Sequence, residues 1–314
     1  MSSPNAEGKN PLEYVNCNLC GSDDTELLYP STLAGDLSNN DAQRYRCTSL
    51  SYGLHPPIVR CKVCGLVYTS PRREGGVILD NYEKVVDETY LEEREGRVLT
   101  FRRNLRPLEN LVSPTDGRRL LDVGCYTGVF LEIAQERGWE AWGVEPSRWA
   151  VEEARRRGLR VMAGTLEEAE FADELFDVVT MWDVIEHLTD PMGKLREVHR
   201  ILKRDGIVCI HTMNIESPFA KLMGRRWPWL MEMHLYYLSP RTLARMLEKA
   251  GFQVIGSITQ GRFLRLGYLI SRLEPYSRVI SRGLSRLAKM LRLAAVPVSI
   301  NLGDLFTTYA RKTG

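Results

Sequence analysis

Leu120-Leu-Asp-Val-Gly124-Cys-Tyr-Thr-Gly128-Val-Phe130 is the stretch that decides the fold. An apolar run that contains Asp122 leads into a glycine-bearing turn, and a helical pattern follows Gly128. A strand, a glycine turn and a helix N-terminus in this order bring backbone N–H groups against a ligand. Glu145 ends the next apolar run, about 20 residues on, where an acid can accept both hydroxyl protons of a ribose. These features predict a nucleotide-type site.

The surrounding chain alternates short apolar runs with helical stretches. The apolar runs span 119–124, 140–145, 159–163, 176–182, 206–212 and 252–258, and the helical stretches span 128–137, 147–157, 191–203 and 240–250. Asp190-Pro191 and Ser239-Pro240 each offer an N-cap followed by proline at the first helical position. Alternation at this spacing predicts an α/β protein with a doubly wound, mostly parallel sheet.

The glycine turn also selects among nucleotide-binding families. Gly124-Cys-Tyr-Thr-Gly128 lacks the G-x-G-x-x-G fingerprint, which excludes an NAD-type dehydrogenase. The segment resembles the first motif of class I S-adenosylmethionine-dependent methyltransferases, an acid followed by G-x-G-x-G. The resemblance continues, in order, through 143–147, 176–179, 183–187, 202–206, 234–239 and 250–252.

The resemblance implies a Rossmann-like sheet of seven strands whose last strand, 305–311, is antiparallel. It implies S-adenosyl-L-methionine as cofactor, with the turn and strand-end residues as its contacts. The residues implied are Asp122, Gly124, Cys125, Gly128, Glu145, Thr165, Leu166, Trp182 and Asp183. Tyr126 occupies the place of the middle glycine, which is either an ordinary variation or a cause of weaker cofactor binding.

Seven cysteines, an odd number, make a disulfide framework unlikely in a chain that begins without an export signal. Four of them form two C-x-x-C-G pairs that look like the knuckles of a zinc ribbon, namely Cys17, Cys20, Cys61 and Cys64. Four thiolates suit a closed structural Zn²⁺ site, and Cys47 is a possible substitute ligand. We expect a disordered tail over 1–11, a zinc-ribbon-like subdomain over 12–76, a helical cap over 77–117 and the methyltransferase domain over 118–314.

A second, speculative divalent site involves Asp183, Glu186, His187 and His234. Their pattern is similar to the metal motif of 2′-O-methyltransferases of small RNAs and of O-methyltransferases of ubiquinone synthesis, and it would hold Mg²⁺ or another divalent ion. Two alternatives remain open. The site is metal-free, with His187 or His234 taking the acceptor's proton beside Asp183, or Glu186 and His187 only pack the loop. His211 is a reserve candidate for the base.

Two insertions bear on the acceptor. Residues 214–238 should form a lid, in which Arg225, Arg226, Trp227, Trp229 and Tyr236 either hold the acceptor or pack as core. Residues 262–300 should form a basic amphipathic helical insertion, because 262–297 contains eight bases and one acid, a net charge of +7 in a chain of net charge +2. One basic and one apolar face favour an anionic membrane surface over packing against protein.

The sequence therefore predicts a methyltransferase that O-methylates a lipid-linked, glycan or other small-molecule hydroxyl. We expect it in the cytoplasm, with a peripheral position on the inner face of the membrane as the further option. RNA methylation is an alternative, disfavoured because residues 12–70 are not markedly basic. A non-catalytic, cofactor-binding scaffold is a second alternative. The oligomeric state is not predicted.

Overall fold

The computed structural model describes residues 12–33, 42–112 and 117–313, so the expected tail over 1–11 lies outside the described residues. Its main sheet has seven strands in the order β12-β15-β10-β9-β6-β7-β8. The strands are β6 (Arg119–Val123), β7 (Glu140–Glu145), β8 (Arg160–Ala163), β9 (Phe176–Trp182), β10 (Leu202–Met213), β12 (Phe252–Thr259) and β15 (Leu305–Lys312). β15 runs antiparallel to both of its neighbours, and the remaining pairs are parallel. The predicted Rossmann-like sheet is confirmed.

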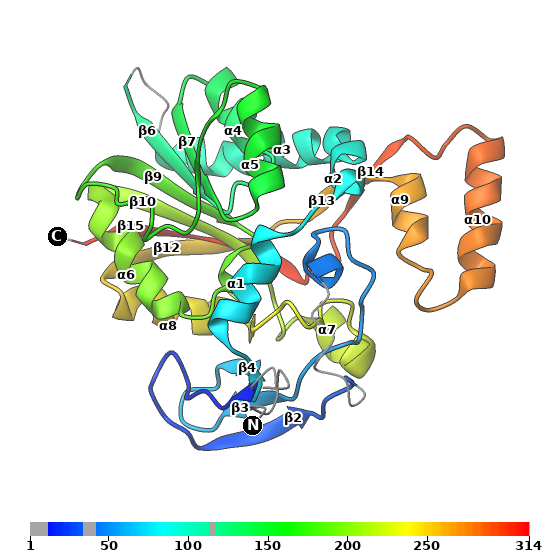
Figure 1. Cartoon of the computed structure of the whole chain (residues 1–314), viewed down its shortest axis with the longest axis horizontal. Coiled ribbons are helices and arrows are strands. Elements are labelled where there is room, and N and C mark those ends of the chain that lie inside the picture. Colours follow the sequence, from blue (N-terminus) through cyan, green and yellow to red (C-terminus); the bar gives the residue numbers. More distant parts are fainter. Residues whose placement is uncertain (1–11, 34–41, 113–116, 314) are drawn as a thin grey trace, which may run out of the picture.

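Helices cover both faces of this sheet (Figure 1). One face carries the helices that precede or follow the first strands, α3 (Arg94–Leu111), α4 (Val129–Glu136) and α5 (Arg148–Arg156). The other face carries α6 (Pro191–Ile201) and α8 (Pro240–Lys249). Strands β6, β9 and β10 are buried almost throughout, as expected for strands covered on both sides.

Local sequence explains where these helices begin. The side chain of Asp190 accepts a hydrogen bond from the Gly193 N–H, and Ser239 forms a capping box with Thr242. Each cap satisfies N–H groups that the first turn leaves without intrahelical partners. Proline at the first helical position follows both caps, so these two helix starts are confirmed.

The cysteine-bearing N-terminal part forms antiparallel strands at one end of the molecule. Its four-stranded sheet has the order β11-β4-β3-β2 and includes β2 (Thr25–Tyr29), β3 (Ile58–Cys61) and β4 (Val67–Thr69). The fourth member, β11 (Tyr236–Tyr237), belongs to the predicted lid. A separate pair joins β1 (Leu12–Glu13) to β5 (Arg72–Arg73). The cysteine-bearing strands are therefore joined through β11 to the segment between β10 and α8, which the sequence analysis placed in a different domain.

Short helices complete the described chain. Between the two parts lie α1 (Gly75–Glu83) and α2 (Glu88–Glu92), and the lid contains α7 (Pro218–Met223). Three-residue or four-residue 3-10 turns occur at Ala42–Tyr45, Ile185–His187 and Gly224–Arg226. Residues 77–112 are thus mainly helical, as expected.

The insertion over 262–300 is only partly helical, which corrects the expectation. It begins and ends with an antiparallel pair, β13 (Arg262–Arg265) and β14 (Pro297–Ile300). Between them lie α9 (Leu266–Ser271) and α10 (Arg278–Met290), which project from the body at the right of Figure 1. Pairing with β14 holds residues 262–265 in an extended conformation.

Candidate active site

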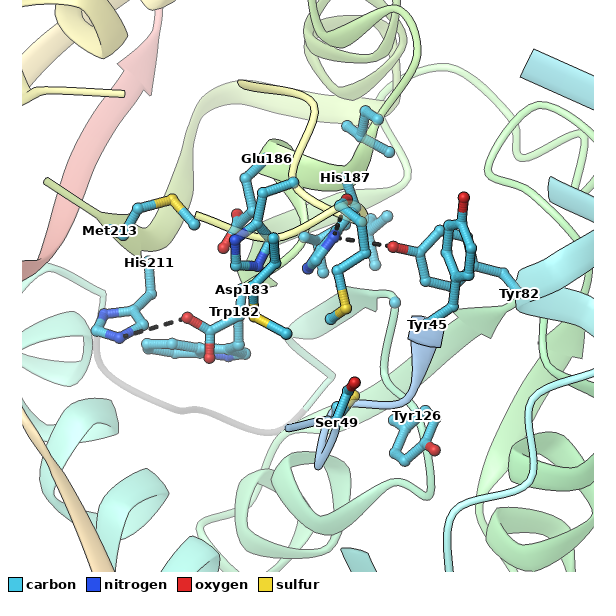
Figure 2. Close-up of a pocket in the computed structure, with 18 of the residues that line it drawn as sticks. Tyr45, Ser49, Tyr82, Tyr126, Trp182, Asp183, Glu186, His187, His211 and Met213 are labelled. Atoms are coloured by element: carbon cyan, nitrogen blue, oxygen red, sulfur yellow. Dashed lines mark hydrogen bonds and ion pairs between the residues drawn. The ribbon is translucent and has the colours of Figure 1, made fainter. Parts of the chain in front are cut away.

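A cavity of about 720 Å³ lies at the carboxyl ends of the central strands. It is lined by the turns after β6, β7, β8 and β9, by α1 and α3, and by residues of β13 and α9. In parallel sheets this is the edge at which ligands bind. Figure 2 shows the part of the cavity in which Asp183, Glu186 and His187 face Tyr82 and His211.

Two carboxyl groups stand at the strand ends inside this cavity. Glu145 accepts hydrogen bonds from the N–H groups of Tyr126 (3.0 Å) and Ser147 (2.8 Å), and burial raises its pKa to about 7. Asp122 accepts from the Thr180 hydroxyl at 2.7 Å, and burial raises its pKa to about 8. Backbone donors thus hold Glu145 at the end of β7, where a carboxylate can receive ligand hydroxyls.

The turn after β6 approaches the cavity closely. Gly124 has φ +68°, and a Cβ there would lie 2.6 Å from Cγ2 of Val184, so a larger residue is excluded by both strain and space. Tyr126 also has a left-handed φ of 48°, and its ring packs edge-on against Tyr90, with centroids 4.4 Å apart. The side chain in the middle-glycine position is therefore accommodated by aromatic packing along the cavity wall.

Most of the implied cofactor contacts line the same cavity. These are Asp122, Gly124, Cys125, Glu145, Thr165, Leu166, Trp182 and Asp183. Gly128 does not line it. A Cβ on Gly128 would lie 2.2 Å from Cδ1 of Leu159. This glycine therefore allows the start of α4 to pack closely against Leu159, which lies between α5 and β8.

A three-residue cluster occupies the other end of the cavity. Glu186, His187 and His234 each offer a ligand atom, and these atoms lie within 4.8 Å of one another. The two imidazole rings are 4.8 Å apart. The backbone holds the cluster together, because the Leu235 N–H donates to the carbonyl of Glu186 at 2.8 Å.

The hydrogen bonds of the two imidazoles define their tautomers. Nδ1 of His187 lies 2.8 Å from the Met233 carbonyl and 2.9 Å from the Tyr82 hydroxyl, and Nδ1 of His234 lies 2.6 Å from the Trp229 carbonyl. A carbonyl only accepts, so Nδ1 carries the proton in both rings and Nε2 keeps its lone pair. Burial lowers the pKa of His187, and burial together with His187 lowers the pKa of His234 to about 3. Both rings are therefore neutral at physiological pH.

Glu186 and Asp183 behave differently although they are close in sequence. Glu186 is buried, its Oε2 has no hydrogen-bond partner, and burial and the Asp183 charge raise its pKa to about 8. Asp183 instead binds Arg262, whose Nη2 is 3.2 Å from Oδ1 and 3.3 Å from Oδ2. Burial opposes ionisation of Asp183, but Arg262 and His211 outweigh it and lower the pKa of this carboxyl.

Asp183 is therefore not a member of the three-residue cluster, which differs from the four-ligand site expected from sequence. His211 lies beside it, with Nε2 3.8 Å from Oδ1 of Asp183 and Nδ1 2.8 Å from the Thr307 hydroxyl. Figure 2 shows this contact on the side of Asp183 away from His187. Burial lowers the pKa of His211 to about 4.

The four paired cysteines meet outside the cavity. Sγ of Cys17 is 3.3 Å from Sγ of Cys64, Sγ of Cys20 is 3.5 Å from Sγ of Cys61, and all four lie within 4.8 Å of one another. Cys47 is not a member of this group and lines the cavity instead. Sulfur atoms at this spacing match the ligand set of a tetrahedral zinc ion, whose Zn–S bonds measure about 2.3 Å.

Several cavity residues carry no recognisable pattern in the sequence. Arg97 of α3 lies over the ring of Tyr90 at 3.4 Å, and its buried Nε has no hydrogen-bond partner. Arg262, Tyr82 and Tyr268 also line the cavity. Arg97 stands in a run of charges and the others in helical or strand patterns, so only the tertiary structure brings them to the site.

The lid lines the cavity with Phe219, Pro228, Trp229, Met231, Met233 and His234. Of the five lid residues named from sequence, Trp229 lines it, beneath the guanidinium of Arg262 at 5.2 Å. Trp227 is 2% exposed and donates to Asp304, and Tyr236 is buried, so both belong to the core. Arg225 and Arg226 are exposed and do not line the cavity.

Comparison with known proteins identifies the family of the chain. Residues 90–257 match the family described as "Methyltransferase domain". The ubiquinone biosynthesis O-methyltransferase of Aeromonas salmonicida is 30% identical over 152 residues, which cover 44% of this chain and 64% of that protein. The protein of the same name from Azorhizobium caulinodans is 32% identical over 165 residues, covering 48% and 62%. The chain therefore spans less than two thirds of the length of these relatives.

Solved structures also resemble this chain. A methyltransferase from Archaeoglobus fulgidus is 23% identical and covers 72% of this chain and 100% of that one, with a TM-score of 0.49. A possible histamine N-methyltransferase from Thermotoga maritima is 22% identical and covers 72% and 94%, with a TM-score of 0.48. Neither likeness bears on the acceptor. Because the family match takes in more than half of the 314 residues, the chain belongs to the methyltransferase-domain family.

Proposed function

We propose that this methyltransferase transfers the methyl group to a hydroxyl of a small-molecule acceptor, which is lipid-linked or a glycan-like or quinone-like compound. The observation that carries the proposal is the cluster of Glu186, His187 and His234 at the end of the cavity away from Glu145. A hydroxyl acceptor must lose a proton on methylation, whereas the activated methyl donor needs no further activation. The cluster supplies the groups that proton loss requires.

The residues at the strand ends fit the cofactor. Glu145 retains acceptor capacity for two ribose hydroxyls while its own oxygens receive two backbone N–H groups. Gly124 leaves room that any side chain would fill. Arg97 adds a cation with a buried, unpartnered Nε, which suits a carboxylate. Thr165, Leu166 and Trp182 would supply the remaining walls.

At the acceptor end we propose a divalent metal ion bound by Glu186, His187 and His234. Two neutral imidazoles and one carboxylate are a common ligand set for Zn²⁺, Mn²⁺ or Fe²⁺. Both rings donate Nδ1–H to a backbone carbonyl, which orients Nε2 as in many metal sites. Ligand atoms about 2.2 Å from an ion lie at most about 4.4 Å apart. The three ligand atoms would therefore have to approach one another only slightly to bind one ion. Such an ion would lower the pKa of a bound hydroxyl.

The metal-free alternative assigns the proton to a histidine. Burial and the neighbouring His187 lower the pKa of His234 to about 3, which makes His234 a weak proton acceptor at neutral pH. The same neutrality favours metal ligation, because a ligating imidazole must be unprotonated. His187 is the better base if no metal is used.

We also propose a structural Zn²⁺ at Cys17, Cys20, Cys61 and Cys64. Cys61 and Cys64 flank the turn between β3 and β4, and β4 pairs with β11 immediately after His234. The Thr69 N–H donates to the Leu235 carbonyl at 2.9 Å. Zinc would therefore stabilise the strands that hold His234 in the cluster.

The decisive experiment is calorimetric titration of the full chain with S-adenosylhomocysteine, followed by Mn²⁺ binding measured by electron paramagnetic resonance. We expect micromolar cofactor-product binding and one Mn²⁺ site that is lost in His234→Ala but kept in His199→Ala. If the wild-type chain binds S-adenosylhomocysteine but not Mn²⁺, the metal proposal is rejected and His187 is the base. Absence of product binding by folded protein would overturn the proposal.

A further inference from the structure

The α9–α10 hairpin, residues 266–296, leaves a continuous apolar surface uncovered. α10 packs toward α9 through small residues, and Ser281 and Ala288 are its buried positions. Its large apolar side chains point elsewhere and are exposed. They are Val279 (82%), Ile280 (57%), Leu284 (40%), Leu287 (46%), Met290 (72%) and Leu291 (53%). The apolar face of α10 is therefore not used to dock the hairpin on its own domain.

The bases of the hairpin are exposed as well. Arg278, Arg282, Arg286, Lys289 and Arg292 are all exposed, and Glu274 is the one acid in 262–297. Arg278 approaches Glu274 at 3.8 Å. Within the described chain, no ion pair joins Arg282, Arg286, Lys289 or Arg292 to a carboxylate. The helix α10 projects from the body of the molecule (Figure 1). Its exposed side chains form an apolar stripe beside a row of cations that have no carboxylate partner among the described residues.

We propose that the α9–α10 hairpin is a docking surface for an anionic phospholipid membrane. Charge complementarity selects this partner, because a net positive segment with exposed apolar side chains matches anionic headgroups above an acyl boundary. Long arginine side chains can reach the headgroups while the apolar side chains enter the boundary. Among the described residues, no helix is long and apolar enough to cross a bilayer, so the contact is at the surface.

The hairpin is also a wall of the reaction cavity. Tyr268, Leu269 and Arg272 of the α9 region line it, and Arg272 donates to the carbonyls of Thr48 and Ser49. Docking of α10 would therefore bring this wall beside the lipid surface. This step rests on the proposed function, and it favours an amphiphilic acceptor that reaches the cavity from the membrane.

The test is sedimentation of the full chain with vesicles of phosphatidylglycerol and phosphatidylcholine, against vesicles of phosphatidylcholine alone. We expect binding to the anionic vesicles that falls between about 0.05 M and 0.5 M salt. Removing Arg282 and Arg286 as R282Q/R286Q should weaken binding about fivefold for each charge, and V279S/M290S should abolish it. Matched controls are R148Q/R156Q on α5, which removes the same charge, and Leu222→Ser, an 84% exposed residue of α7.

Three results would overturn the proposal: equal binding to neutral vesicles, no binding to either, or controls that weaken binding as much as the hairpin variants do. Light scattering on the same samples tests whether a second copy of the chain occupies this surface instead. A dimer that V279S/M290S converts to monomer, without vesicle binding, would assign the apolar face to a second copy. S-adenosylhomocysteine titration without vesicles reports separately on the proposed function, so vesicle binding with no cofactor-product binding would contradict only that function.

Discussion

Arg262 of β13 binds the carboxylate of Asp183 across the cavity, with Nη2 3.2 Å and 3.3 Å from the two oxygens. The two residues are 79 positions apart in the chain. Asp183 follows β9, whereas Arg262 opens the insertion that carries the α9–α10 hairpin. Asp183 is thus paired with Arg262 and lies outside the cluster of Glu186, His187 and His234, and the contact links the cavity to the insertion that carries the hairpin.

Replacing Arg262 by glutamine should change the pH profile of turnover. Arg262 and His211 hold the pKa of Asp183 below its ordinary value although burial opposes ionisation. A depressed carboxyl pKa keeps the group ionised to lower pH, so losing Arg262 moves the acid limb of kcat to higher pH. Arg102→Gln, which removes an exposed arginine of α3 that pairs with Glu136 and does not line the cavity, is the control. An unchanged acid limb would mean that Asp183 ionisation does not govern the rate.

Asp122→Asn should stabilise the cofactor-free protein as pH rises. Burial raises the pKa of Asp122 to about 8, so the folded state takes up a proton that the unfolded state has released above pH about 4. That contribution to stability is full below the unfolded pKa and is lost as pH rises through the folded pKa. Asparagine can still accept a hydrogen bond from Thr180. The free energy of unfolding of the variant, relative to that of the wild type, should therefore rise by about 2–4 kcal/mol between pH 5 and pH 8. Urea unfolding at pH 5 and pH 8 measures this difference. If the free energies of unfolding of the two proteins change equally with pH, the raised pKa of Asp122 is contradicted.

Gly124→Ala should weaken cofactor binding and lower stability. A Cβ at φ +68° is strained and would lie 2.6 Å from Cγ2 of Val184, which together cost about 1–3 kcal/mol. Adding Val184→Ala removes the clash but not the strain, so the double variant should recover part of the loss. Thermal unfolding and S-adenosylhomocysteine titration measure both effects. Full affinity in the single variant would show that the turn can move.

Removing zinc should destabilise the protein more than it affects the nucleotide end. Cys61→Ser removes one of four sulfurs grouped at the turn between β3 and β4. Glu145 and Gly124 instead lie at the ends of β7 and β6 in the main sheet. We expect less than one zinc per chain and a Tm lower by about 5 °C or more. Cys47→Ser is the matched control, because Cys47 is outside the group. Full zinc content in Cys61→Ser would contradict the assignment.

The sequence by itself determined the sheet, most helix starts and the nucleotide end. Apolar runs, N-cap residues and glycine turns act within a few residues, so their consequences follow from local backbone geometry. The C-x-x-C-G pairs are local in the same way, because each forms its own turn. These features were predictable from the chain, including Glu145 at the end of β7.

Only the tertiary structure decided which distant groups meet. The position of β13 brings Arg262 to Asp183, 79 positions earlier in the chain. The pairing of β4 with β11 placed the cysteine-bearing strands beside His234. The α10 pattern allowed its apolar face to turn inward, yet the small residues Ser281 and Ala288 face the protein and leave the large ones outside. Such outcomes depend on packing between segments far apart in sequence, where pattern and propensity carry no information.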